Sequence, residues 1–155
     1  MHLGHGNCAT VCLSCNIRPA ETLRGALLVS KGPEMTESDI ETTNRFEPRF
    51  DVSGLITAVC VDAAGGEVLM VAHMNAESLA MTRETGFAHF WSRSRQMLWK
   101  KGESSGHVLR LVEMLVDCDQ DCLVLRVEAN GPACHTNART CFYRKVTPDG
   151  LLQRG

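Results

Sequence analysis

The alternation of apolar and polar positions predicts a domain that is rich in β-sheet. Two apolar, β-branched runs at 55–62 and 67–74 are separated by the small residues 63–66, which is a typical hairpin signal. Asn75 then suits the N-cap of a short helix of about nine residues, and Gly86 suits the position that ends it. The pattern therefore predicts a hairpin followed directly by a helix.

Further apolar runs predict additional strands. These runs lie at 88–94, 97–102, 107–117, 122–129 and 141–146. The run 107–117 is mostly apolar on both faces, which favours a buried strand, although a helix of this length is also compatible with it. Five or more strands with one clear helix predict an α+β fold, built mainly on antiparallel β-sheet with one or two short helices.

The N-terminal residues differ from the rest of the chain. Residues 1–45 are rich in small and polar side chains without apolar periodicity, so we expect a flexible leader, with Met35 as an alternative start. The predicted domain then covers 46–147, and a short tail covers 148–155. The leader also contains Cys8, Cys12 and Cys15. Their spacing can hold an iron–sulfur cluster in radical S-adenosylmethionine enzymes, but the chain is too short for the barrel that such enzymes need.

Length and charge exclude several classes of protein. The chain has 155 residues, of which 44% are apolar and 22% charged, and its net charge is −2, so we expect one domain without a basic surface for nucleic acid. No apolar run approaches the ~18 residues of a membrane span, and no secretory signal is recognisable. We therefore expect a cytoplasmic protein without a membrane or nucleic-acid partner, whose eight cysteines stay reduced.

The segment D-C-D-Q-D-C is the most unusual part of the sequence. If it is extended, Asp117, Asp119 and Asp121 project to one side of the strand. Cys118 and Cys122 then project to the other side. Three neighbouring carboxylates repel one another unless a cation lies among them, and oxygen ligands of this kind suit Mg²⁺ or Ca²⁺.

The thiols suggest a softer metal. Cys118, Cys134 and Cys141 can supply three sulfurs, and three protein ligands with one open position are typical of catalytic zinc. Because Cys118 would point away from the aspartates, its partners would lie on the far face, in the same chain or across a subunit contact. Cysteine is also a common small buried residue, and this is our interpretation of Cys60 and Cys122.

Two histidines are candidates for catalysis. His135 follows Cys134 directly, so it could be a fourth ligand or a general base and acid beside the metal. His107 follows a loop of small residues that would allow a ligand to approach closely. His73 and His89 lie in apolar strands, and we interpret them as structural.

Cationic and aromatic residues cluster between 91 and 107. Arginine forks match phosphate oxygens, so the cluster indicates an anionic substrate. Trp91 and Trp99 can stack on a planar base, although core packing is the simpler explanation of each. The candidate substrate-binding residues are Trp91, Ser92, Arg93, Arg95, Lys100 and Arg139.

Three segments carry a resemblance to a known family. These are "WSRSRQMLWKKGESSGH", "VDCDQDC" and "GPACHTNARTCFYR", and in this order they resemble the phosphoribosyl-AMP cyclohydrolases of histidine biosynthesis over roughly 46–144. The resemblance implies a homodimer whose zinc site is shared across the interface, and a monofunctional enzyme. It also implies catalysis by His135. The implied ligands are Cys118, Cys134 and Cys141 for Zn²⁺, and Asp117, Asp119 and Asp121 for Mg²⁺.

The resemblance also implies a reaction. This is the zinc-dependent hydrolytic opening of the purine ring of 1-(5-phosphoribosyl)-AMP at the N1–C6 bond, which gives the formimino-aminoimidazole-carboxamide ribotide in the third step of L-histidine biosynthesis. Zinc would activate the attacking water, and His135 and His107 would move protons. A zinc deaminase is the first alternative, but its H-x-E and P-C-x-x-C motifs are missing. A structural zinc module is the second, and it would leave the three aspartates without a role.

Overall fold

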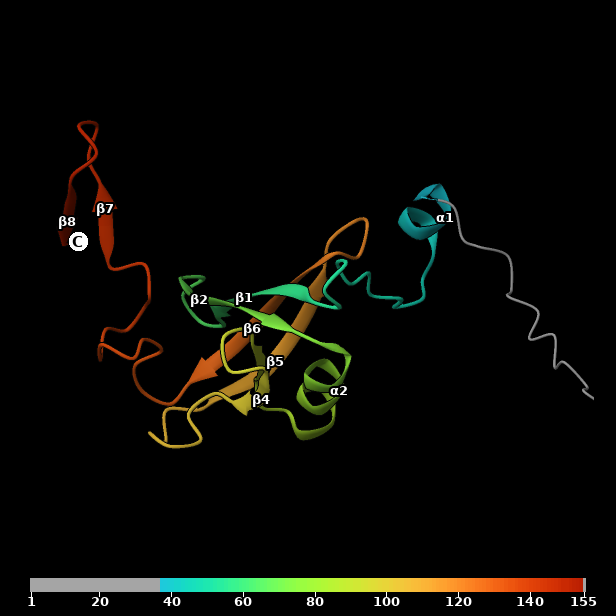
Figure 1. Cartoon of the computed structure of the whole chain (residues 1–155), viewed down its shortest axis with the longest axis horizontal. Coiled ribbons are helices and arrows are strands. Elements are labelled where there is room, and N and C mark those ends of the chain that lie inside the picture. The colour runs from blue at the N-terminus through green and yellow to red at the C-terminus, as the bar shows by residue number, and fades with distance from the viewer. Residues whose placement is uncertain (1–36, 155) are drawn as a thin grey trace, which may run out of the picture. The chain divides into compact units, whose positions relative to one another are not determined.

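The structure is a computed structural model that describes residues 37–154. Residues 1–36, with most of the predicted leader and its three cysteines, lie outside the described residues. The main sheet has six strands in the order β4-β3-β2-β1-β6-β5 (Figure 1). These strands are β1 (Ile56–Asp62), β2 (Val68–Met74), β3 (His89–Ser92), β4 (Met97–Lys100), β5 (Leu109–Val116) and β6 (Cys122–Ala129).

Pairing within this sheet is almost entirely antiparallel. Only β1 and β6 run parallel to each other, and the other neighbouring pairs of the six strands are antiparallel. The predicted α+β fold on a mainly antiparallel sheet is therefore confirmed. The described helices are α1 (Glu37–Thr42) and α2 (Ala76–Thr85), and neither is long and apolar enough to cross a membrane.

The hairpin and the helix that follows it form where local signals predict them. Strands β1 and β2 pair with Ile56 opposite Met74. The Asn75 side chain accepts a hydrogen bond of 2.9 Å from the backbone N–H of Ser78, which caps the first turn of α2. Gly86 ends α2 with a φ angle of 71°, a left-handed conformation that glycine adopts at low cost.

The C-terminal strands differ from the prediction. β7 (Arg144–Val146) begins three residues later than the predicted run 141–146, and β8 (Leu152–Arg154), within the predicted tail, pairs with it antiparallel. The backbone N–H of Cys141 instead donates a 2.8 Å hydrogen bond to the carbonyl of Leu69. This bond ties the start of the segment to β2, so its first residues form a turn rather than a strand.

Alternate residues of the central strands form the core. On β1 and β6 these are Ile56, Ala58, Cys60, Leu123, Leu125 and Val127, and all are buried. Cys60 is completely inaccessible, as predicted for a small buried residue, and its burial raises the pKa of its thiol to about 12. This cysteine is therefore part of the packing and keeps its proton.

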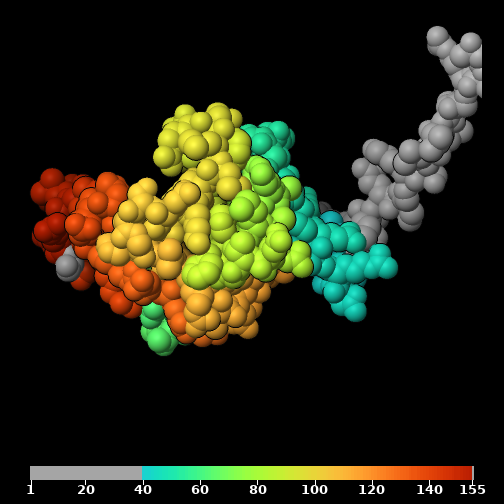
Figure 2. All heavy atoms as spheres, turned by 90° about the horizontal axis from the view of Figure 1, so that it is seen from below, coloured from blue at the N-terminus to red at the C-terminus, as the bar shows by residue number. Residues whose placement is uncertain are grey.

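The strand predicted at 107–117 forms as β5, but it is more exposed than predicted. The prediction of a strand buried on both faces is wrong, because Val112, Leu115 and Val116 are 51%, 46% and 40% exposed. Within the described residues β5 is the last strand of the sheet and pairs with β6. On its other side only its first residues are bonded, through a bridge between Phe87 and Arg110 and backbone hydrogen bonds to 86–88, so the rest of β5 forms an open edge. Figure 2 shows orange side chains of this part of the chain at the surface of the visible face, below the light green of α2. An apolar edge strand of this kind is a surface suited to pairing with another chain.

Candidate active site

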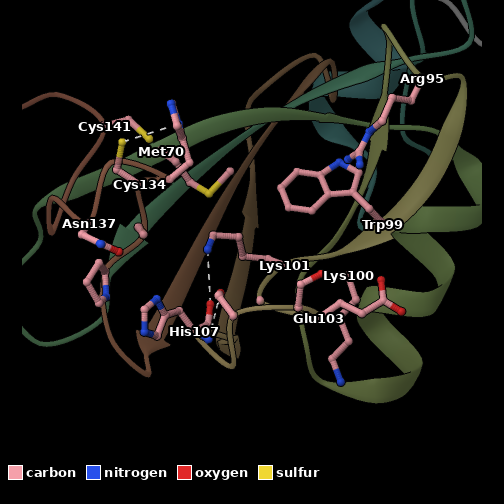
Figure 3. Close-up of a pocket in the computed structure, with 16 residues that line it drawn as sticks. Met70, Arg95, Trp99, Lys100, Lys101, Glu103, His107, Cys134, Asn137 and Cys141 are labelled. Carbon is pink, nitrogen blue, oxygen red and sulfur yellow. Dashed lines mark hydrogen bonds between the residues drawn. The ribbon is translucent and has the colours of Figure 1, made fainter.

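A cavity of about 450 Å³ lies between the β4–β5 loop and the segment that follows β6 (Figure 3). Six of the predicted site residues line it: Arg95, Lys100, His107, Cys134, His135 and Cys141. They come from parts of the chain that are far apart in sequence and meet only in the folded sheet. The cavity therefore combines thiols, imidazoles and cations.

The thiols of Cys134 and Cys141 form the sulfur-rich end of this cavity. Figure 3 shows the two side chains with their sulfurs turned toward each other. The Thr136 hydroxyl lies 3.1 Å from Sγ of Cys134, and hydrogen bonds from Thr136 lower the pKa of Cys134. Burial, followed by the neighbouring Cys134, raises the pKa of Cys141. Cys134 is thus the thiol of the pair that loses its proton more readily.

His107 is held by two glycines. Gly131 has a φ angle of 97°, and a methyl group added there would lie 2.6 Å from Cδ2 of the His107 ring. A methyl group added at Gly102 would lie 2.3 Å from the His107 carbonyl carbon. These contacts leave no room for a side chain at either position, so the ring of His107 packs directly against the backbone.

His135 lies at the edge of the cavity. It is exposed, and its Nδ1 is 3.9 Å from Sγ of Cys134. Because Nδ1 faces the sulfur, Nε2 on the other side of the ring points away from it. The side chain is thus placed beside the thiols and still accessible to a bound molecule.

Lys101 lines the same cavity and was not among the predicted site residues. Its side chain is only 9% exposed, and its Nζ donates a 3.3 Å hydrogen bond to the backbone carbonyl of His107. Burial lowers the pKa of Lys101, while the nearby Cys141, Cys60 and Cys134 thiols raise it. A signal was present in the sequence, because the period of two along a strand places Lys101 on the same face as Trp99.

A second cavity of about 380 Å³ adjoins the first. It is lined by the predicted residues Trp91, Ser92 and Arg93, and it shares Arg95 and Trp99 with the first cavity. The Trp99 ring also packs against Phe90, with a centroid separation of 5.2 Å. The tryptophan therefore belongs both to the packing and to a wall between two cavities.

The remaining predicted substrate residue, Arg139, lies elsewhere. Its guanidinium is 2.7 Å from a carboxylate oxygen of Glu67 and 3.3 Å from one of Asp62, at the turn between β1 and β2.

Of the predicted structural histidines, His89 is buried and its Nδ1 lies 2.8 Å from the carbonyl of Phe87. His73 is half-buried, and burial followed by the charge of Arg93 lowers its pKa.

The three predicted aspartates meet in a loop, not along a strand. The extended conformation expected for this segment is wrong, because the chain turns between β5 and β6 and Gln120 adopts a left-handed φ of 61°. The Asp117 carboxylate accepts hydrogen bonds of 3.0 Å from the backbone N–H groups of Asp121 and Cys122, which stabilise the turn. The carboxylate oxygens of Asp117, Asp119 and Asp121 still lie within 4.8 Å of one another.

Charge repulsion is evident in this cluster. The neighbouring Asp119, more than any other group, raises the pKa of Asp121. One guanidinium nitrogen of Arg49 lies 3.7 Å from Asp119 and offsets part of the negative charge. The donor set is all oxygen, close together and solvent-accessible, which fits a hard divalent cation such as Mg²⁺.

Gln120 ties this loop to the segment before β1. Its side chain is 4% exposed and accepts a 2.7 Å hydrogen bond from the backbone N–H of Glu47. Its side-chain Nε2 donates a 3.0 Å hydrogen bond to the carbonyl of Arg45. The backbone carbonyl of Gln120 accepts a 2.8 Å hydrogen bond from the backbone N–H of Arg49. Sequence patterns missed this role, because glutamine in an acidic loop is ordinarily solvated.

Cys118 does not join the other two thiols within one chain. It is exposed in the loop before β6, whereas Cys134 follows the other end of that strand. The eight residues of β6 span roughly 23 Å, which is too far for one zinc ion to bridge. Cys122 is half-buried on β6, and burial raises its pKa. All five described cysteines are free thiols.

Comparisons with known proteins agree on one family. A family model described as phosphoribosyl-AMP cyclohydrolase matches residues 70–143. A phosphoribosyl-AMP cyclohydrolase of Sphingopyxis alaskensis is 64% identical over 112 residues, which cover 72% of this chain and 89% of the relative. The protein of the same name from Rhizorhabdus wittichii is 59% identical over 114 residues, which cover 74% of this chain and 92% of the relative. The one from Nitrobacter hamburgensis is 58% identical over 119 residues, which cover 77% of this chain and 81% of the relative.

Proposed function

Because the chain belongs to the phosphoribosyl-AMP cyclohydrolase family, we propose that it hydrolyses 1-(5-phosphoribosyl)-AMP in the third step of L-histidine biosynthesis. Water adds to C6 of the purine, the N1–C6 bond breaks, and the oxygen remains as that of a carboxamide. N1 gains a proton and stays in the formimino group that carries the second phosphoribosyl unit. The observation that supports this chemistry most strongly is the cavity that combines two thiols, two imidazoles and cationic groups.

The thiols of this cavity suit zinc. Cys134 and Cys141 would supply two soft ligands at the end of the cavity, and Cys118 of a second copy would supply the third. Zinc bound by three protein ligands would supply a Lewis acid that activates the attacking water.

The separation of the cysteines supports a homodimer. Since Cys118 lies beyond the reach of the other two thiols in its own chain, a complete trio needs two chains. The exposed apolar residues Val112, Leu115 and Val116 lie on the strand that leads to Cys118, where a second copy would cover them. A two-fold arrangement would complete two equal sites at once.

The two histidines would handle the protons. His135 has Nε2 turned away from the sulfur of Cys134, so it can accept a proton from the attacking water. His107 is fixed against Gly131 on another wall of the cavity, which suits it to deliver a proton to N1. Because both rings line the cavity that holds the thiols, the proton transfers need no large movement of the protein.

The cationic residues would bind the two phosphates. The substrate has a phosphoribosyl group at each end of the purine, and the two cavities adjoin through Arg95 and Trp99. A substrate placed across that wall would reach Arg93 and Ser92 in the second cavity and Lys100 in the first. Arg139 would act there only after leaving its pairs with Glu67 and Asp62.

The aspartate loop would hold Mg²⁺. Asp117 and Asp119 flank Cys118, so in the proposed dimer the loop that brings the third sulfur also brings the magnesium ligands to the partner's cavity. There the cation would help to orient the negatively charged substrate. Reduced thiols are required throughout, which supports a cytoplasmic location.

The proposal is tested by turnover. The purified protein, loaded with zinc and magnesium, is mixed with 1-(5-phosphoribosyl)-AMP while the ultraviolet absorbance change of ring opening is followed. We expect turnover that a zinc chelator abolishes and added zinc restores. No turnover by the zinc-loaded protein would refute the activity, whereas turnover that survives complete removal of zinc would refute the metal's role only.

A further inference from the structure

Lys101 is a buried cation with no carboxylate partner in the part of the chain that the structure describes. Its side chain is 9% exposed, and the ion pairs found among the described residues do not include it. Among the described residues, the one hydrogen bond of its ammonium group, of 3.3 Å, goes to the neutral carbonyl of His107. Burying an ammonium group without a counter-charge is unfavourable, so a negative partner is expected close by.

Once deprotonated, the thiols of the cavity would provide that partner. Lys101, Cys134 and Cys141 line the same cavity, and Figure 3 shows their side chains around it. A zinc ion with three thiolate ligands carries a net charge of −1. Part of that charge would lie at the buried sulfur of Cys134, where a nearby cation stabilises it more than it would at the surface.

We propose that Lys101 is the counter-charge of the zinc–thiolate centre and that it strengthens zinc binding through its positive charge. This role rests on the proposed function, because it needs the three-cysteine site. The hydrogen bond to the His107 carbonyl fixes where the ammonium lies, and it links the β4–β5 loop to the same centre.

The neighbouring lysine provides a matched control. Successive residues of a strand face opposite sides, and the Nζ of Lys100 lies 4.4 Å from the centroid of the Phe87 ring. Removing the charge of Lys100 therefore removes a cation next to Lys101 in sequence, but not the one directed toward the thiols.

The test measures zinc affinity on the full chain by competition with a chromophoric chelator. Lys101→Met removes the charge while keeping a long unbranched side chain. Lys101→Gln removes the charge but keeps a hydrogen-bond donor toward the His107 carbonyl. We expect both to weaken zinc binding about tenfold, Lys101→Arg to stay within about threefold of the wild type, and Lys100→Met to leave the affinity unchanged.

Each other outcome is decisive. Wild-type zinc affinity in Lys101→Met would overturn the proposal. Wild-type affinity in Lys101→Gln alone would also overturn it, because the hydrogen bond and not the charge would then matter. An arginine variant as weak as the methionine variant would also overturn it. If the wild type binds no zinc at all, the proposed function fails first. Thermal melting of each metal-free variant identifies any loss of affinity that comes from misfolding.

Discussion

Replacing Gly131 by alanine tests whether the backbone beside His107 positions that ring. The φ angle of 97° is unfavourable for alanine and costs about 1–2 kcal/mol. The added methyl would lie 2.6 Å from Cδ2 of His107, so the imidazole must move, at a further cost of about 1–3 kcal/mol. We therefore expect Gly131→Ala to lose roughly 2–5 kcal/mol of unfolding free energy and to lower kcat strongly.

Gly66→Ala is the matched control for this change. Gly66 has a φ angle of 74°, and a methyl group added there would meet no atom within 4 Å. It should therefore show only the backbone cost of about 1–2 kcal/mol and unchanged kcat. Urea denaturation gives the free energies, and turnover of 1-(5-phosphoribosyl)-AMP gives kcat. Equal stability losses and equal kcat values for the two variants would refute the contact between Gly131 and His107.

Three further changes test other parts of the site. Gln120→Ala leaves the N–H of Glu47 and the carbonyl of Arg45 without partners and should cost about 2 kcal/mol in urea denaturation. The exposed Gln153→Ala should cost under about 0.5 kcal/mol. Asp119 raises the pKa of Asp121, so the metal-free fold gains stability as the pH falls toward that pKa. Asp121→Asn should therefore raise the melting temperature of chelator-treated protein at neutral pH, yet abolish stabilisation by Mg²⁺. A lower melting temperature of the chelator-treated variant would contradict the repulsion. Mixing inactive Cys118→Ala and Cys134→Ala chains should restore about one quarter of wild-type turnover. Half of the dimers are then mixed, and each mixed dimer has one complete site out of two. No recovery after confirmed chain exchange would refute the shared site.

Local signals were sufficient for the elements that depend on neighbouring residues. The hairpin of β1 and β2 and the caps of α2 are determined within a few positions, and Asn75 and Gly86 fill the predicted places. The burial of β5 could not be predicted in the same way. Its apolar residues look alike whether the strand lies inside the sheet or at its edge, and only the strand order decides between the two.

Long-range geometry explains what the sequence could not show about the site. Cys118 and Cys134 are 16 positions apart in the sequence (134 minus 118), but β6 holds them at opposite ends of the sheet. The acidic segment was expected to be extended, yet a left-handed Gln120 reverses it and still brings the carboxylates together. The burial of Lys101 likewise depends on a cavity wall formed by distant segments.

The most direct test of the central claim is the identity of the product. Mass spectrometry of 1-(5-phosphoribosyl)-AMP after incubation with the zinc-loaded protein distinguishes ring opening from loss of the exocyclic nitrogen. The account predicts one product that is heavier than the substrate by a single water molecule, formed only while zinc is present. A product in which the amino group has been replaced by oxygen, with ammonia released, would show a deaminase and contradict the account.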